Sequence, residues 1–211
     1  MELYCTLPKV LKQPSLGYHP FLCDFGRGFY CAESQKAAIE LASLEEPNRF
    51  CCRYELDAAN LAVLDLNRDW RNPLKWVAML IQNRQFSLKL PVAQAAADYL
   101  LRHFLPDTSD IDIIRGYRAD GVNFSFARDF LNNAITLRQL KTALESGELW
   151  EEVVLRSERA VSLLRLVEVI SVKESEFTFT IGAAGSGRSR LREHILSWEE
   201  PAGKTCSLRT S

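Results

Sequence analysis

The sequence predicts an α+β fold, because strand patterns and helical patterns occupy separate parts of one chain. Short apolar runs with the composition of strands lie at residues 2–5 and 163–172. Between them, apolar residues at 76–83 and 92–104 recur every three or four positions, which is the spacing of helices. The 211 residues, 47% of them hydrophobic, suffice for one domain with a substantial core. We therefore expect a mixed domain rather than regular βαβ winding.

The first third of the chain is expected to supply four strands and one helix. The strands are residues 2–5, 29–31, 49–56 and 60–66, and the helix is residues 33–42. A loop rich in proline follows the first strand. The glycines of DFGRG, residues 24–28, then mark a sharp backbone bend directly before the strand that carries Tyr30.

The rest of the chain is expected to alternate helices with strands. The helices at 76–83 and 92–104 are both expected to pack on a sheet. The later helices are expected at 124–131 and 137–144, with a helical turn at 157–161. The later strands are expected at 111–114, which runs into the turn RGYRADG, and at 151–155, 163–172 and 175–181. Thr136 is a plausible cap for the helix that begins at Leu137. We assign residues 1–181 to one domain and residues 182–211, which open with GAAGSGRSR, to a flexible C-terminal tail.

Composition argues against several classes of function. The formal charge of -1 and a pI near 6.3 do not indicate a nucleic-acid-binding protein that acts through bulk charge. The six cysteines form no CxxC pair and have no histidine at zinc-ligand spacing, so no metal is expected. No apolar stretch is long enough to span a bilayer. We expect a cytoplasmic protein with reduced thiols.

Three separated segments resemble the three signature strands of the ADP-ribosyltransferase fold, in the branch of diphtheria toxin and poly-ADP-ribose polymerase whose motif is His-Tyr-Glu. Leu-Tyr-Cys-Thr at residues 3–6 matches the first strand, where that branch has an aromatic residue, His and Gly. Gly-Arg-Gly-Phe-Tyr at 26–30 matches the second, and Glu-Val-Val-Leu at 152–155 matches the third. The resemblance implies split, twisted mixed or antiparallel sheets with flanking helices.

The chain is similar over a longer range to a bacterial family of transferase-like domains that are often taken as toxins of toxin-antitoxin pairs. The similarity is carried, in the same order and with similar spacing, by DFGRGFYCAE, DIIRGYRADG, FSFARDFLNNAITLRQL and VVLRSERA. It covers roughly residues 2–172. A lone GRGFY would be weak evidence, and several ordered matches are much stronger evidence.

The resemblance implies NAD as a substrate and assigns residues to its binding. These residues are Tyr4, Cys5, Thr6, Gly26, Arg27, Gly28, Phe29 and Tyr30. Tyr30 would stack on the nicotinamide, and the glycines would let the backbone approach the dinucleotide. The backbone around Cys5 and Thr6 would hold the carboxamide.

The chemistry of NAD cleavage explains why a glutamate is needed. Breaking the bond between nicotinamide and ribose gives a transition state with ribosyl-cation character, which a carboxylate hydrogen-bonded to the ribose stabilises selectively. Glu152 is the candidate for this role, with Glu151 directly before it. Strand alternation allows only one of the two to face the site, and the sequence leaves open which one.

Other residues have both a functional and a structural interpretation. Cys5 stands where the motif has His, and a free cysteine often serves as a small buried hydrophobic residue. His19 could replace the missing His or be an idle loop residue. Arg118 and Asp120 could border the NAD or acceptor site or form a surface ion pair. His103 is expected to be structural.

The leading hypothesis is an NAD-dependent ADP-ribosyltransferase that modifies a macromolecular acceptor as the toxin of a bacterial toxin-antitoxin pair, with a small antitoxin protein as a partner. The alternative is a catalytically degenerate member of the fold that acts as an NAD-binding or protein-interaction module. A third hypothesis is an unrelated nucleotide-binding or RNA-acting α+β protein in which GRGFY occurs by chance.

Overall fold

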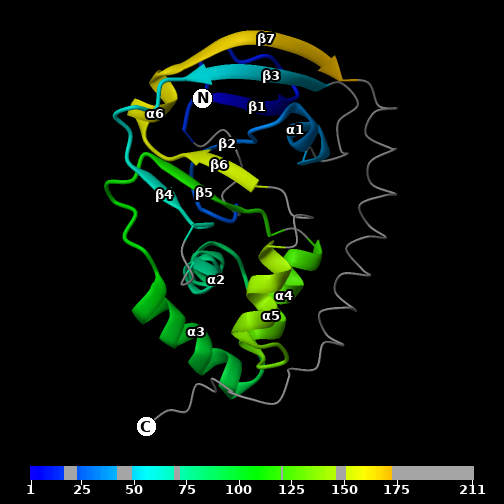
Figure 1. Ribbon diagram of the computed structural model, residues 1–211, viewed down its shortest axis with the longest axis vertical. Coiled ribbons are helices and arrows are strands. Elements are labelled where there is room, and N and C mark those ends of the chain that lie inside the picture. The colour runs from blue at the N-terminus through cyan, green and yellow to red at the C-terminus, as the bar shows by residue number, and fades with distance from the viewer. Residues whose placement is uncertain (17–22, 42–48, 69–71, 120, 146–150, 173–211) are drawn as a thin grey trace.

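The computed structural model describes residues 1–16, 23–41, 49–68, 72–119, 121–145 and 151–172. In this part the chain forms two β-sheets and six helices, which confirms the predicted α+β class (Figure 1). No helix within it combines the length and the hydrophobicity needed to cross a membrane. The strand expected at 175–181 and the tail expected from residue 182 lie outside the described residues.

The first sheet has three antiparallel strands in the order β1 (Glu2–Leu7), β3 (Arg49–Leu56) and β7 (Leu164–Val172). Cys5 of β1 lies opposite Cys52 of the central strand β3. The pairing of β3 with β7 shifts register between Arg53 and Tyr54. All three strands were expected, and β1 continues two residues beyond the predicted end at Cys5.

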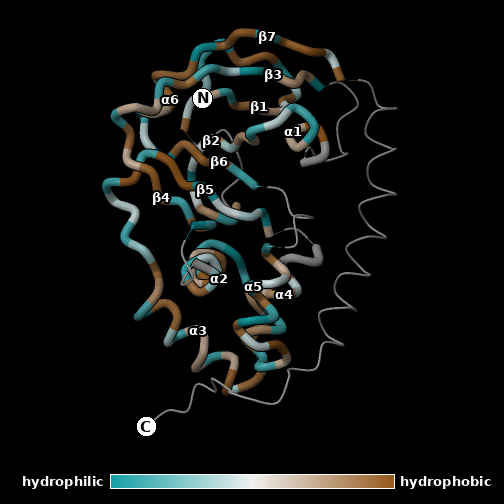
Figure 2. The backbone as a smooth tube through the Cα atoms, in the orientation of Figure 1, coloured by the Kyte–Doolittle hydropathy of each residue, from teal (hydrophilic) through white to brown (hydrophobic). Residues whose placement is uncertain are grey.

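The second sheet has four strands in the order β2 (Phe29–Cys31), β6 (Glu151–Leu155), β5 (Ile113–Tyr117) and β4 (Val63–Asp65). β4 runs parallel to β5, and the other neighbouring pairs are antiparallel, so the sheet is mixed. Figure 2 shows a hydrophilic end and a hydrophobic end on β6, as its sequence Glu-Glu-Val-Val-Leu requires.

The two sheets meet where β1 approaches β2. Tyr4 and Ala32 exchange two backbone hydrogen bonds, each 2.8 Å long, and form an isolated antiparallel bridge. Because β2 also pairs with β6, three strands that are far apart in the sequence lie side by side (Figure 1). These are the three strands that carry the family resemblance.

Alternate strand residues fill the space between the two sheets. Leu3 and Leu7 of β1 share a buried cluster with Phe29 of β2 and with Val153 and Leu155 of β6. The helix α6 (Glu158–Ser162) adds Ala160 and Val161 to this cluster, with Ser157 as its N-cap. A short helix, α1 (Gln35–Leu41), packs on β1 and β3 through Ala37 and Ala38.

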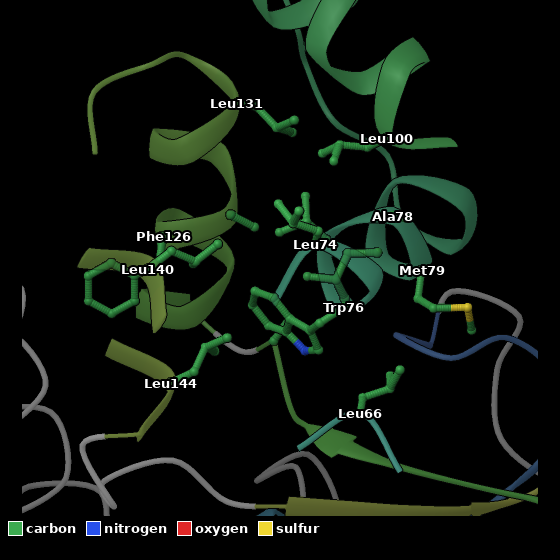
Figure 3. Close-up of a cluster of buried hydrophobic side chains, with 14 of the residues drawn as sticks. Leu66, Leu74, Trp76, Ala78, Met79, Leu100, Phe126, Leu131, Leu140 and Leu144 are labelled. Carbon is green, nitrogen blue, oxygen red and sulfur yellow. The ribbon is translucent and has the colours of Figure 1, made fainter. Parts of the chain in front are cut away.

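Four helices form a layer on the outer side of the second sheet. They are α2 (Asn72–Asn83), α3 (Pro91–Phe104), α4 (Gly121–Leu131) and α5 (Leu137–Glu145). Figure 3 shows side chains from all four converging around Trp76, which is 1% exposed. The same cluster includes Ile114 and Val154 of the sheet, so this helical layer and the sheet share one core.

The structure corrects three details of the predicted elements. Arg115, Gly116 and Tyr117 continue β5 rather than opening a turn, because they pair with β6. α3 packs mainly on α2 and α4 rather than on a sheet, since α2 lies between it and the strands (Figure 1). β4 is shorter than the predicted strand at 60–66. The predicted cap is confirmed, because Thr136 Oγ1 accepts a 3.2 Å hydrogen bond from the Gln139 backbone.

Candidate functional site

Tyr30 and Glu152 lie on the same face of two neighbouring strands. In the antiparallel pairing of β2 with β6, Tyr30 lies opposite Val154. Side chains two residues apart in a strand point to the same side, so Glu152 and Val154 share the face of Tyr30. Glu152 is 7% exposed, and its charge is close enough to contribute to the raised pKa of the Tyr30 hydroxyl. The fold therefore brings together the two side chains that the sequence singled out.

The Tyr30 hydroxyl is fixed by the bend that precedes it. It donates a 2.6 Å hydrogen bond to the Gly26 carbonyl and accepts one of 3.2 Å from the Phe25 backbone N–H. Burial, together with Cys23 and Glu152, raises its pKa far above the ordinary value, so the phenol is neutral at every physiological pH. The phenolic proton is already donated to Gly26, so Tyr30 is suited to act through its ring and cannot act as a base.

The structure explains why both residues 26 and 28 of the GRG bend are glycines. Gly26 has a φ of +79°, which side-chain-bearing residues rarely adopt. A Cβ atom at Gly28 would lie 2.4 Å from Val154 Cγ1 and 2.8 Å from the Leu155 carbonyl oxygen, so only glycine lets the bend approach β6 this closely. Arg27 between them is exposed, whereas Phe29 is fully buried. The bend thus holds the Tyr30 hydroxyl on the face of the sheet that carries Glu152.

Arg118 is the cation next to Glu152. One of its terminal guanidinium nitrogens lies 3.5 Å from Glu152 Oε1, and the two side chains are 33% and 9% exposed. Arg118 directly follows β5, whose Gly116 lies opposite Glu152 in the sheet. Arg118 therefore contacts the buried candidate glutamate, and its place beside an NAD or acceptor site stays a prediction. Asp120, considered together with it, lies outside the described residues, as does His19.

Asp24 is a second buried carboxylate near this site, and sequence reasoning gave it no role beyond marking the bend. It is 3% exposed, and its Oδ2 accepts a 2.6 Å hydrogen bond from the Ala119 backbone N–H. Its Oδ1 accepts one of 2.9 Å from Arg84, which directly follows α2. Asp24 therefore ties the bend to α2 and to the residue after Arg118. The sequence feature that could have indicated this role is the position of Asp24 beside the glycine-rich bend.

Glu151 faces the other side of the sheet. It lies opposite Tyr117, on the face that carries Arg115, and the side chains of Glu33 and Asp65 are near. Burial raises its pKa, while Arg115 opposes the shift and Glu33 adds to it. Arg115 forms an ion pair with Glu33 and lies 3.9 Å from Asp65. Of the two adjacent glutamates, only Glu152 shares a face with Tyr30.

β1 contributes its backbone to this region more than its side chains. The Cys5 thiol is 4% exposed and packs in the inter-sheet cluster, where its hydrogen bond with Cys31 and its burial raise its pKa well above the ordinary value. The Thr6 hydroxyl donates a 2.8 Å hydrogen bond to the Ala38 carbonyl of α1. Tyr4 bridges to Ala32 through its backbone. The structure thus agrees with the interpretation of Cys5 as a small buried hydrophobic residue, although Glu152 still contributes to its pKa shift.

His103 adds no group to this site, whereas the half-buried Cys23 thiol is close enough to Tyr30, Glu152 and Arg118 to interact with them, and burial raises its pKa. His103 is exposed on α3, with its ring 4.4 Å from that of Tyr99. The cysteines in the described part of the chain are free thiols. Among those residues, no three His, Cys, Asp or Glu side chains are arranged to hold a metal ion.

The arrangement suits charge stabilisation. A buried carboxylate attracts a cationic group strongly, because the low local dielectric weakens its interactions less than water does. Glu152 has Arg118 3.5 Å away, and it interacts electrostatically with the neutral phenol of Tyr30. It is therefore able to accept a hydrogen bond from a hydroxyl and to oppose positive charge that develops nearby.

A protein-family model described as "Protein of unknown function (DUF3990)" matches residues 1–166. This range includes each of the candidate site residues discussed above. Neither the curated proteins nor the solved structures contain a match to the chain.

Proposed function

The chain belongs to the DUF3990 family, and we propose that it is an NAD-dependent ADP-ribosyltransferase that modifies a macromolecular acceptor as the toxin of a bacterial toxin-antitoxin pair. The observation that carries the proposal is the placement of Tyr30 and Glu152 on the same face of the neighbouring strands β2 and β6. In the His-Tyr-Glu branch that the sequence resembles, these two residue types hold the nicotinamide and the ribose.

The spatial arrangement of the strands gives further support. The segments that resemble the signature strands lie at residues 3–6, 26–30 and 152–155 in the sequence, yet their strands lie side by side in the fold. Segments that resembled the signature strands only by chance would not be expected to lie next to one another in the fold.

Glu152 has the leading chemical role in this proposal. Its carboxylate accepts a hydrogen bond from a ribose hydroxyl of NAD and opposes the positive charge that develops as the nicotinamide leaves. Tyr30 offers its ring to the nicotinamide, and the backbone of β1 at Tyr4 to Thr6 offers hydrogen bonds to the carboxamide. An acceptor group then attacks the ribose carbon, and ADP-ribose is transferred.

A second candidate function is favoured by specific observations on β1 and β2. The Cys5 thiol and most of the Tyr30 ring are buried, and the Thr6 hydroxyl is already bonded to α1. These features fit a member of the fold that has lost catalysis and acts as an NAD-binding or protein-interaction module.

Release of nicotinamide from NAD separates these candidates. We expect the purified protein to release nicotinamide and Glu152→Gln to lower the rate at least about 100-fold, the size typical of removing one electrostatic group from a catalytic site. Glu151→Gln is the matched control, because the same substitution one residue earlier changes the opposite face of β6. It is expected to keep the rate within about threefold, since it leaves the Tyr30 face intact.

Tyr30 needs a conservative variant because its ring is buried. Tyr30→Phe keeps the ring and is expected to retain most of the activity, whereas Tyr30→Leu removes the aromatic surface and is expected to raise KM for NAD. Both variants must show the circular dichroism of the parent protein. A transferase-active protein is further expected to label a macromolecular fraction with tagged NAD and to arrest bacterial growth on expression, and Glu152→Gln should abolish both effects.

Absence of nicotinamide release, together with absence of heat protection by NAD, would overturn the enzyme proposal. Heat protection without release would favour the NAD-binding module, because a ligand that binds only the folded state raises its apparent stability. Loss of release in Glu151→Gln with retention in Glu152→Gln would reverse the assignment of the glutamate.

A further inference from the structure

Arg118 is the more exposed partner of the ion pair with Glu152. Its side chain is 33% exposed, whereas that of Glu152 is 9% exposed. A ligand that contacts the Glu152 carboxylate therefore comes within reach of the guanidinium. Because the two side chains form an ion pair, a ligand that binds to Glu152 is expected to change the position of the Arg118 side chain.

The backbone on both sides of Arg118 is held by buried side chains. The Tyr117 carbonyl accepts a 2.7 Å hydrogen bond from Trp76 Nε1, and Trp76 is 1% exposed. The Ala119 N–H donates a 2.6 Å hydrogen bond to Asp24, which is 3% exposed. The backbone at Arg118 is therefore held in place. The long side chain can still reorient and contact a different partner.

The Arg118 side chain is 33% exposed beside Glu152, so it is accessible to an incoming anion. The 3.5 Å separation is longer than the roughly 2.7–2.9 Å of a charge-assisted hydrogen bond. A planar guanidinium offers five N–H donors in a fork that fits phosphate oxygens in a bidentate manner. A phosphate placed beside Glu152 is thus able to compete with the carboxylate for Arg118.

We infer that Arg118 binds the diphosphate of a nucleotide substrate and releases Glu152 when it does so. Without ligand, Arg118 compensates the charge of the buried carboxylate. With ligand, the guanidinium moves to the diphosphate, and Glu152 accepts a hydrogen bond from the ribose that carries it. This inference rests on the proposed function for the identity of the substrate, but diphosphate binding by Arg118 is measurable without catalysis.

Titration calorimetry with ADP tests the inference. Arg118→Gln is expected to weaken ADP binding about tenfold or more, because it removes a charge-assisted contact, and Arg118→Lys to recover part of the loss. Glu152→Gln is expected to tighten ADP binding several-fold, because the competing carboxylate is gone. The double variant is expected to bind like Arg118→Gln, since the effect of Glu152 on ADP acts through Arg118.

Two controls separate this effect from general loss of structure or charge. Arg102→Gln removes an exposed arginine on α3 and is expected to leave the affinity for ADP unchanged within twofold. Adenosine, which has no phosphate, is expected to bind parent and Arg118→Gln equally. Each variant is used only if its unfolding temperature matches that of the parent within a few degrees.

The outcomes distinguish this inference from the proposed function. Equal ADP affinity in Arg118→Gln and Arg102→Gln, weaker ADP binding in Glu152→Gln, or no ADP binding by the parent would overturn it. Tighter ADP binding in Glu152→Gln together with no nicotinamide release by the parent would support the diphosphate site and contradict the transferase. If the parent releases nicotinamide and Arg118→Gln leaves the KM for NAD unchanged, the transferase is supported and the diphosphate site at Arg118 is contradicted.

Discussion

Glu151 and Glu152 are neighbours in the chain, yet they lie in two different environments. Glu152 faces the side of the sheet that carries Tyr30 and the helical layer, and its partner is Arg118. Glu151 faces the other side, among Arg115 and two further carboxylates. The comparison shows that the alternation of side chains along one strand places two identical residues on opposite faces, where their neighbours differ.

The two environments also differ in how firmly they are built. On the Glu152 side, the buried side chains of Asp24 and Trp76 fix the backbone around Arg118, and the bend of Gly26 fixes the Tyr30 hydroxyl. On the Glu151 side, Arg115 forms an ion pair with Glu33, which is 41% exposed, and Glu151 interacts with Arg115 and Asn67. Ion pairs with an exposed partner contribute little to stability, whereas unpaired buried polar groups are costly. The Glu152 side is therefore expected to respond more strongly to substitution.

The largest effect is expected from Asp24→Ala, which removes the carboxylate that holds both Arg84 and the Ala119 N–H. Two charge-assisted hydrogen bonds are lost and the amide is left without this acceptor, so we expect the free energy of unfolding to fall by about 3 kcal/mol. Urea denaturation monitored by circular dichroism measures it. Asp110→Ala, which removes an exposed carboxylate, should stay within about 0.5 kcal/mol of the parent. Equal effects of the two substitutions would contradict the anchoring role of Asp24.

A smaller effect is expected from Gly28→Ala, which brings a methyl group against Val154 and the Leu155 carbonyl. Overpacking of this kind costs about 1–3 kcal/mol, and it would push the bend away from β6. We expect a loss of about 2 kcal/mol in urea denaturation. A companion substitution, Val154→Ala, removes the nearest methyl groups and should relieve part of the clash when combined with Gly28→Ala. Purely additive effects of the two changes would show that the contact is not the cause.

The smallest effect is expected from Glu151→Gln and concerns pH. Burial raises the pKa of Glu151 above its ordinary value of 4.5, so the folded state binds more protons than the unfolded state in that range. Its contribution therefore makes the free energy of unfolding fall as the pH rises from 4.5 through the folded-state pKa. Glu151→Gln should make this fall shallower, by no more than about 1 kcal/mol between pH 4 and pH 7.

Urea denaturation at several pH values measures this difference. Glu145→Gln, at an exposed carboxylate on α5, is the control and should leave the slope unchanged. A steeper fall in Glu151→Gln than in the parent would contradict the assigned direction of the pKa shift.

Most elements were predictable because their signals are local. The period of apolar residues predicted α3 and α5 nearly to their ends, and β-forming runs predicted β2, β3 and β6 at their observed bounds. The turn expected at Arg115 to Gly121 was wrong in its first three residues. Those residues are held in β5 by pairing with β6, about 35 positions further along the chain, and local sequence carries no trace of that partner.

The candidate site was predictable in its residue types but not in its arrangement. The GRGFY motif and the glutamate before an apolar strand indicated Tyr30 and Glu152 through a family resemblance, and their role in NAD chemistry stays a prediction. The anchoring of Arg118 by Asp24 and Trp76 could not be predicted, since these contacts join the bend, α2 and the end of β5.

The sequence by itself determined the α+β class, most of the strands and helices, and the fact that Glu151 and Glu152 must face opposite ways. These follow from hydrophobic periodicity and from the pleat, which depend on neighbours in the chain. Only the tertiary structure decided which glutamate shares a face with Tyr30, that Arg118 is its cation, and that the Cys5 thiol is buried between the sheets. These depend on strand register and on contacts between distant segments, which the chain acquires only when its sheets close on a common core.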